Sequence, residues 1–279
     1  MTFSIVAREG REGRAFGVAV ASKFLAVGGV VPAARLGTGA IATQSYARVS
    51  FKADLLSHLA RGNSASRALA AVTADDLEAM KRQGGGVGSK DAATFTGSGC
   101  HPWAGGTSGE GSNGDDSAYA IQGNVLTGPE VIAEMERAFL DSAGQSFTRR
   151  LLASLMAGDA AGGDSRGRQS AALYAVAPKA GYDRSGVLAD LRVDDNSDAI
   201  NELARIHDLH ELYFGAPEDV QPLIGDLELE VRSRLDGLGY RGRPLADDLA
   251  LWAGEANLET RLTRDGIDGR VLEELRKAG

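Results

Sequence analysis

The sequence predicts an α+β domain in which helices pack on a sheet, followed by a small helical segment. Two strand patterns at residues 2–9 and 15–22 flank the link "GREGR", whose glycines and charges are typical of a hairpin. The runs "GVAVA", "AIAT" and "SAALYAV" contain small apolar residues on both faces, as expected for strands buried on both sides. Leucines at helical spacing in "FKADLLSHLARG" indicate that helices begin near residue 51.

The remaining elements follow from the same patterns. Ser64 is a plausible N-cap of a second helix, and Thr127 with Pro129 marks the start of another. We expect extended segments at 23–35, 37–47, 92–100, 118–126, 170–178 and 182–194, and helices at 51–62, 64–76, 127–142 and 146–163. The segment 101–117 is rich in Gly and Ser, and long loops of this kind are usually functional or disordered.

From residue 197 onward the chain becomes acidic and helical in pattern. We therefore expect two domains, an αβ domain over 1–215 and a small helical domain over 216–279. No internal repeat or coiled-coil heptad is evident in the sequence.

Composition limits the classes of function. The formal net charge is -8 and the pI is about 5.1, which argues against nucleic-acid binding and against a polybasic membrane contact. Cys100 is the single cysteine, so an intrachain disulfide or a thiolate metal site cannot form. No secretion-signal pattern begins the sequence, and we expect a cytoplasmic protein.

Thr2 is the first candidate for chemistry. Initiator methionine is normally removed before a small residue, and the mature chain would then begin with Thr2. A terminal threonine carries a nucleophilic hydroxyl beside an α-amine with a pKa of about 7.7–8.0, which can act as a general base. Threonine is also common after methionine, so an ordinary chain start accounts for it as well.

Several motifs resemble a known family. The segment "TFSIVARE…GRAFGVAVASKFLAVGGVVPAARLGTGAIATQSYA" is similar to the start of the bacterial DUF1028 family, which is grouped with the N-terminal nucleophile (Ntn) hydrolases. "GSGCHPWAGG", "YAIQGNVLTGPEVIAEMERAF" and "AGGDSRGRQSAALYAV" extend the resemblance to about residue 215. In the tail, "GYRGRPLADDLALWAGEANLETR" resembles a small domain named for peptidoglycan binding. The resemblance implies a four-layer αββα sandwich of the Ntn-hydrolase type, with Thr2 as nucleophile.

Around Thr2 the resemblance implies further site residues. Ser22 stands where proteasome-like relatives carry an aspartate, and Arg35 is the nearest cation to the place of their supporting lysine. Arg35 would act electrostatically, or it forms a surface salt bridge. Gln44 and Ser45 lie where an oxyanion-hole turn is expected, although a strand-end glutamine also occurs without function.

Two later segments complete the implied site. In "IQGNVLTGPE", Gly123 and Asn124 could bind an oxyanion, or Gly123 could supply a positive φ in a structural turn. In "GGDSRGRQ", Asp164 could hold the terminal amine or orient the nucleophile. Two arginines there, Arg166 and Arg168, could bind a substrate carboxylate, or the loop is simply ion-paired.

The other reactive residues favour ordinary roles. Cys100 and His101 are adjacent, so in a strand their side chains would point to opposite faces. Trp103 could form the floor of a substrate pocket. The pair His207 and His210 has no third ligand nearby in the sequence, so we expect no metal site and no cofactor.

The sequence thus favours a threonine amidohydrolase or peptidase that acts on a small amide or peptide substrate. The alternative is an inactive Ntn-fold protein that binds or regulates, which the serine at Ser22 and the arginine at Arg35 favour. If the tail binds cell-wall fragments, the substrate would be a muropeptide. We expect a homodimer, because the helical layers of this superfamily often pair.

Overall fold

The computed structural model describes residues 2–10, 14–111 and 114–278. Residues 11–13, the centre of the expected hairpin link, lie outside this part of the chain. The chain divides into two compact units, Met1–Arg205 and Ile206–Gly279, whereas we expected the boundary between residues 215 and 216. No helix in the described part of the chain is both long and apolar enough to cross a membrane.

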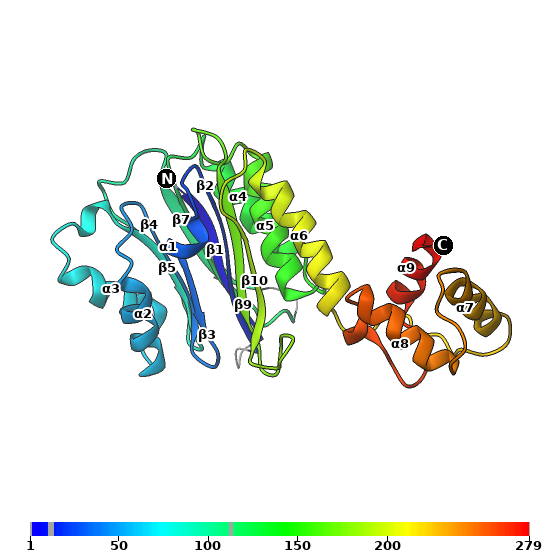
Figure 1. Cartoon of the computed structure of the whole chain (residues 1–279). Helices are drawn as coiled ribbons and strands as arrows, with labels where there is room; N and C mark the ends of the chain where they lie inside the picture. Colours follow the sequence, from blue (N-terminus) through cyan, green and yellow to red (C-terminus); the bar gives the residue numbers. More distant parts are fainter. Residues whose placement is uncertain (1, 11–13, 112–113, 279) are drawn as a thin grey trace. The chain divides into compact units, whose positions relative to one another are not determined.

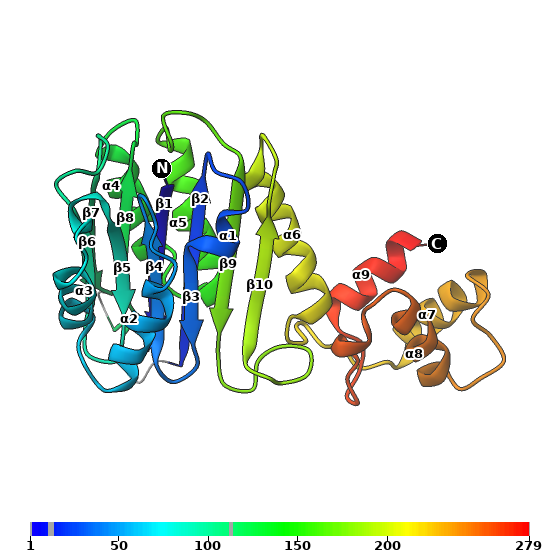
Figure 2. The ribbon, with the colours of Figure 1, turned by 60° about the vertical axis from the view of Figure 1, so that its left-hand side comes forward.

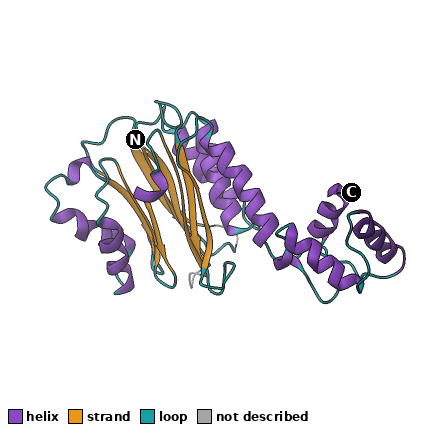
Figure 3. Ribbon diagram, viewed as in Figure 1, coloured by secondary structure: helices purple, strands orange, loops and turns teal. Residues whose placement is uncertain are grey.

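The first unit is a mixed αβ structure that contains every strand found in the described residues (Figure 3). The strands are β1 (Thr2–Glu9), β2 (Ala15–Ser22), β3 (Pro32–Arg35), β4 (Gly39–Gln44), β5 (Gln83–Val87), β6 (Ala92–Thr96), β7 (Gly105–Glu110), β8 (Ala118–Asn124), β9 (Ser170–Val176) and β10 (Val187–Val193). The helices of the chain are α1 (Val27–Val30), α2 (Phe51–Ala60), α3 (Ala65–Ala74), α4 (Glu130–Asp141), α5 (Phe147–Ala160), α6 (Ala199–Phe214), α7 (Gly225–Gly237), α8 (Leu245–Glu255) and α9 (Gly269–Ala278).

Two antiparallel sheets form the centre of this unit. One has six strands in the order β10-β9-β2-β1-β8-β7, and the other has four in the order β3-β4-β5-β6. Figure 1 shows the sheets face to face, with α2 and α3 outside the smaller sheet and α4 and α5 outside the larger one. The view in Figure 2 shows β1 between β2 and β8, and both of these neighbours pair with it in antiparallel register. β1 is therefore an interior strand with partners on both edges.

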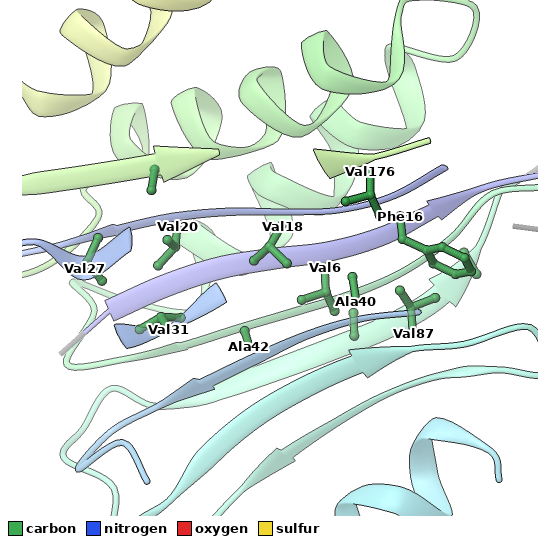
Figure 4. Close-up of a cluster of buried hydrophobic side chains, with 13 residues drawn as sticks. Val6, Phe16, Val18, Val20, Val27, Val31, Ala40, Ala42, Val87 and Val176 are labelled. Carbon is green, nitrogen blue, oxygen red and sulfur yellow. The ribbon is translucent and has the colours of Figure 1, made fainter. Parts of the chain in front are cut away.

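The layer between the sheets is apolar over most of its length. Val6, Val18, Val20, Ala42 and Val87 belong to one buried cluster there (Figure 4). They alternate along their strands with residues that face the helices, as the period of two requires. On β1, Thr2 and Ser4 share the face of Val6, so this face becomes polar toward the beginning of the strand.

The outer faces of both sheets are covered by amphipathic helices. Phe51, Leu55, Leu59 and Leu69 from α2 and α3 pack with Ile41 of β4 in a second buried cluster. On the larger sheet, a Cβ added at Gly17 would lie 2.6 Å from Leu151 Cδ1, so the absence of a side chain lets α5 approach β2 closely.

The second unit has a separate core. Val231, Leu235, Leu249, Trp252 and Val271 are buried together between α7, α8 and α9. The side chain of Arg261 is 3% exposed and donates to the carbonyls of Glu211 and Leu212, at 2.8 and 2.6 Å. It also pairs with Asp268 at 3.0 Å. This arginine therefore binds carbonyls in the last turn of α6, one of which, that of Glu211, also accepts from the Gly215 amide at 3.0 Å.

Three details differ from the expected elements. The segment 23–35, expected to be extended, contains the short helix α1 before β3. The Gly/Ser-rich segment 101–117 contains strand β7, which forms one edge of the larger sheet. Strand β5, with the sequence "QGGGV", was not expected, because glycine is depleted in strands and this one carries no apolar alternation.

The glycines of β5 differ in the space around them, which leads to a prediction. A Cβ at Gly85 would lie 1.9 Å from Oε1 of the buried Gln122, whereas a Cβ at Gly86 would meet nothing closer than 3.6 Å. Gln122 cannot move without losing its hydrogen bonds to Ser4, at 3.2 and 2.6 Å. We expect Gly85→Ala to lower the free energy of unfolding by about 2–4 kcal/mol in urea denaturation.

The matched control is Gly86→Ala, which should change this free energy by less than about 1 kcal/mol. Equal losses in the two variants would contradict the close approach of the sheets at Gly85.

Candidate functional site

Thr2 lies at the beginning of β1, in the polar end of the layer between the sheets. It pairs with Asn124 of β8 and is 4% exposed. Its Oγ1 lies 3.1 Å from Oγ of Ser22, the last residue of β2. The hydroxyl therefore contacts the neighbouring strand β2, whereas the backbone of Thr2 pairs with β8 on the other side.

The backbone carbonyl of Thr2 is held by two side-chain amides. Gln44 Nε2 donates to it at 3.1 Å and Asn124 Nδ2 at 3.4 Å. Both amides also donate to Oε1 of Gln83, at 2.8 and 2.9 Å respectively. A primary amide has two hydrogens, so both groups are fully used in positioning Thr2 and in binding Gln83.

Further buried groups extend this arrangement, which we call the amide cluster: Ser4, Gln44, Gln83, Gln122 and Asn124. Ser4 Oγ donates to Gln44 Oε1 at 2.7 Å, and Gln122 Nε2 donates to Ser4 Oγ at 2.6 Å. Every member is uncharged and at most 1% exposed. Buried polar groups are tolerated when they satisfy one another, and such networks hold a single arrangement.

A pocket of about 650 Å³ opens beside Thr2. Thr2, Gln44 and Asn124 line it from the sheets. Two connecting segments supply most of the remaining lining: Phe24, Val27, Val30 and Val31 from one, and Ser45, Tyr46 and Ala47 from the other. Arg82 and His101, which lie far apart in the sequence, complete it.

The apolar wall of the pocket is the segment 24–31, which includes α1. The Val27 amide donates to Ser170 Oγ at 3.1 Å, and the Ala26 amide donates to the Asp194 carbonyl at 2.9 Å. Both bonds attach this segment to the larger sheet and the loop after it, so the wall is fixed in place.

A second part of the lining follows the end of β4. Ser45 and Tyr46 have φ angles of 55° and 52°, in the left-handed region that non-glycine residues rarely adopt. Tyr46 Oη lies 3.1 Å from His101 Nε2, and the Tyr46 carbonyl accepts a hydrogen bond from Arg82 Nη1. Two consecutive strained residues at a pocket are a feature often found at functional sites.

Arg82 contributes a permanent positive charge to the lining, and two nearby carboxylates pair with its guanidinium. Its Nε donates to Asp76 at 2.8 Å and its Nη2 to Glu78 at 3.0 Å. The hydrogen bond from Arg82 holds the pKa of Asp76 below its usual value. The guanidinium is thus fixed by these pairs beside the Tyr46 carbonyl.

The structure brings Thr2, Gln44, Ser45 and Asn124 together, but it does not bring Arg35 to them. Arg35 pairs with Gly39, at the opposite end of β4 from Gln44, and is exposed. Arg35 therefore does not contact Thr2. It lies at the surface, as the alternative of a surface salt bridge requires, but no ion pair of Arg35 is found among the described residues.

Gly123 has a different role from those considered. It lies within β8 rather than in a turn, and the positive φ, 52°, belongs to Val125. A Cβ at Gly123 would lie 2.5 Å from Leu126 Cδ1, so a larger residue there would displace the Leu126 side chain. Its carbonyl accepts from Gln83 Nε2 at 2.7 Å, which joins it to the amide cluster.

Asp164 supports the neighbouring strand instead of contacting Thr2 in the described structure. Its Oδ2 accepts from the Lys23 amide at 2.9 Å and from Arg166 Nη2 at 3.0 Å. Arg168 pairs with Asp159 at 2.7 Å. These contacts make the loop ion-paired and fix the chain directly after Ser22. Asp164, Arg168 and Ser22 also line a second pocket, of about 480 Å³.

The candidate residues between positions 100 and 103 differ in whether they line the pocket beside Thr2. His101 lines the pocket beside Thr2, whereas Cys100 and Trp103 are absent from its lining. Cys100 Sγ lies 3.4 Å from the Arg82 carbonyl. The backbone carbonyl of Trp103 accepts a hydrogen bond from the Leu126 amide at 3.0 Å. Because Trp103 is not part of the lining, it does not form the pocket floor expected of it.

Sequence reasoning missed Gln83, Tyr46 and Arg82, and did not assign His101 to the site. The alternation of Thr2 and Ser4 with apolar residues on β1 was a signal for a polar inner face. Nothing in the sequence indicated that the segments of Arg82 and His101 meet Tyr46, because those contacts are between distant parts of the chain.

One expectation about metals is changed by the structure. In α6 the side chains of His207, Asp208 and Glu211 each place one potential ligand atom within 4.8 Å of the others. Asp208 and Glu211 were not identified from the sequence as possible partners of His207. His210 is not part of this group. The group lies in the second unit and is not part of the pocket at Thr2.

Comparisons with known proteins agree with the two resemblances in the sequence. A model described as "Putative peptidoglycan binding domain" matches residues 213–275. The crystal structure of a protein from Silicibacter pomeroyi, itself described by the DUF1028 model, is similar with a TM-score of 0.65 and 28% identity. The alignment covers 82% of this chain and 92% of that one. No curated protein matches the chain.

A further model, described as "Family of unknown function (DUF1028)", matches residues 2–203, which is well over half of the chain. The protein therefore belongs to the DUF1028 family.

Proposed function

We propose that this protein is an amide-bond hydrolase whose nucleophile is the hydroxyl of Thr2. The observation that carries the proposal is that Thr2, at the start of an interior strand, lines a pocket of about 650 Å³ while its backbone carbonyl is fixed by Gln44 and Asn124. A nucleophile in a rigid frame beside a concave pocket is what covalent catalysis requires. The helix–sheet–sheet–helix layering also supports an Ntn-type sandwich (Figure 1).

The chemistry needs a free amine on Thr2. Cleavage of the peptide bond before Thr2 would place that amine on the same residue as the hydroxyl. The amine takes the hydroxyl proton while Oγ1 attacks the substrate carbonyl carbon. The C–N bond then breaks, and the proton passes to the departing amine. Water hydrolyses the resulting ester, which releases a carboxylic acid and restores Thr2.

Ser45 is the candidate donor to the oxyanion. Its hydroxyl has no hydrogen-bond partner among the described residues, and the residue lines the pocket. The amides of Gln44 and Asn124, by contrast, are occupied by Thr2 and Gln83. A donor that is already positioned stabilises developing negative charge without reorganisation.

The alternative is a binding or regulatory protein that has no hydrolytic activity. The uncharged amide cluster favours it, because within the described residues no ionised side chain makes a hydrogen bond to Thr2. Ser22 also occupies the place where an aspartate is expected. The two functions differ in one requirement: only the hydrolase needs Thr2 to form a covalent ester.

The match of residues 213–275 to a peptidoglycan-binding model supports a more specific candidate. If the second unit binds cell-wall fragments, amides within muropeptides become candidate substrates. A homodimer, a cytoplasmic location and the absence of a cofactor remain predictions.

The first prediction for this function concerns Thr2 itself. In protein isolated from its native host, we expect loss of Met1 and a single covalent adduct on Thr2 after incubation with a hydroxyl-reactive electrophile. Intact-mass spectrometry and peptide mapping would locate both changes. Thr2→Ala should abolish the adduct, and Thr2→Ser should retain it, because serine keeps the hydroxyl and the amine.

Thr38→Ala is a suitable control, since Thr38 is a half-buried threonine that does not line the pocket. A retained methionine with no adduct on Thr2 would instead leave the binding protein as the better account.

A second prediction concerns Ser45. Removing one oxyanion donor typically lowers kcat by about 10²–10³-fold. We therefore expect Ser45→Ala to slow acylation of Thr2 by about that factor, measured as the pseudo-first-order rate of adduct formation. Unchanged acylation in a folded Ser45→Ala protein would show that the oxyanion is stabilised by another group.

A further inference from the structure

The pocket beside Thr2 has two walls of different chemistry, and the difference bears on its substrate. The wall from segment 24–31 carries Phe24, Val27, Val30 and Val31 and has no polar side chain on the pocket. The other wall carries the hydroxyls of Ser45 and Tyr46 with His101. A substrate amide at Thr2 would therefore have its reacting group against polar residues and its side chain against the valines.

The charged residues of the pocket lining determine which substrate side chains can bind there. Among the described residues, no Asp or Glu lines the pocket, so a cationic substituent would have no carboxylate partner from them. Within the described part of the chain, Arg82 is the one permanent cation that lines the pocket, and Asp76 and Glu78 already occupy its Nε and Nη2. An anionic substituent would have to compete with both carboxylates.

We propose that the site takes amides whose acyl part carries an uncharged, apolar side chain, aliphatic or aromatic, which packs against Val27, Val30 and Val31. This inference rests on the proposed function of Thr2 and specifies its substrate class. Burial of apolar surface against a fixed wall stabilises such an acyl group, whereas a charged one loses its hydration without finding a partner.

The test uses three β-lactones that differ in the substituent next to the ring carbonyl: isobutyl, carboxymethyl and aminobutyl. Thr2 Oγ1 attacks the ring carbonyl, the ring C–O bond breaks, and the released alkoxide takes up the hydroxyl proton. The adduct therefore has the mass of the whole probe. The rate of its formation on the full mature chain is measured by intact-mass spectrometry.

We expect the isobutyl probe to acylate Thr2 at least about tenfold faster than either charged probe. A carboxymethyl or aminobutyl probe that reacts as fast as the isobutyl probe would overturn the inference while leaving the proposed function intact. Failure of all three probes on a chain that begins with Thr2 would overturn the proposed function, and the inference would fall with it.

Val30→Asp provides a second measurement, because misfolding would slow every probe and could not speed one of them. Val30 is partly buried and belongs to the apolar wall, so a carboxylate there should slow the isobutyl probe and speed the aminobutyl probe. The control is Val187→Asp, at an exposed position of β10 that does not line the pocket, and it should leave all three rates unchanged. No gain for the aminobutyl probe in a folded Val30→Asp protein would contradict contact of the substituent with this wall.

Discussion

The structure around Thr2 depends on one buried acceptor, Oε1 of Gln83. Two amides that hold the Thr2 carbonyl, Gln44 Nε2 and Asn124 Nδ2, both donate to this oxygen. Gln83 is in turn bound through Nε2 to the Gly123 carbonyl at 2.7 Å and to Thr96 Oγ1 at 2.9 Å. Because these groups come from both sheets, the same contacts that join the sheets also fix the first residue of β1.

This constraint divides the layer between the sheets into two parts. Valines and alanines fill most of it and supply the apolar burial that stabilises the fold (Figure 4). At the end where Thr2 lies, amides and hydroxyls replace them and bind one another, which offsets the cost of their burial. Oε1 of Gln122 is an exception, because it has no hydrogen-bond partner among the described residues. The glycines of β5 are part of this arrangement, since Gly85 makes room for Gln122. The position of Thr2 is thus fixed by the sheet packing, whereas connecting segments supply most of the pocket lining beside it.

Much of the fold could be predicted from local patterns, and less of the site. The strands at 2–9 and 15–22 and the helix near residue 51 follow from apolar periodicity, and the structure confirms them. Strand β5 could not be predicted, because its glycines are selected by the close approach of the other sheet. Arg35 was assigned as the cation nearest to the place of the relatives' lysine, but antiparallel pairing with Gly39 puts it at the far end of β4 from Gln44. Tyr46, Arg82 and His101 meet only through the tertiary fold.

The most direct test of this account is the rate at which Thr2 is acylated in Gln83→Met. Gln83 does not line the pocket and cannot contact the substrate, so its effect must pass through the position of Thr2. Small displacements of a reacting group can cost about 10²-fold in rate, and we expect a loss of at least tenfold in a protein that remains folded by circular dichroism. Exposed Gln145 offers the matched control Gln145→Met, with an unchanged rate. Acylation of a folded Gln83→Met protein at the wild-type rate would show that the amide cluster does not position Thr2.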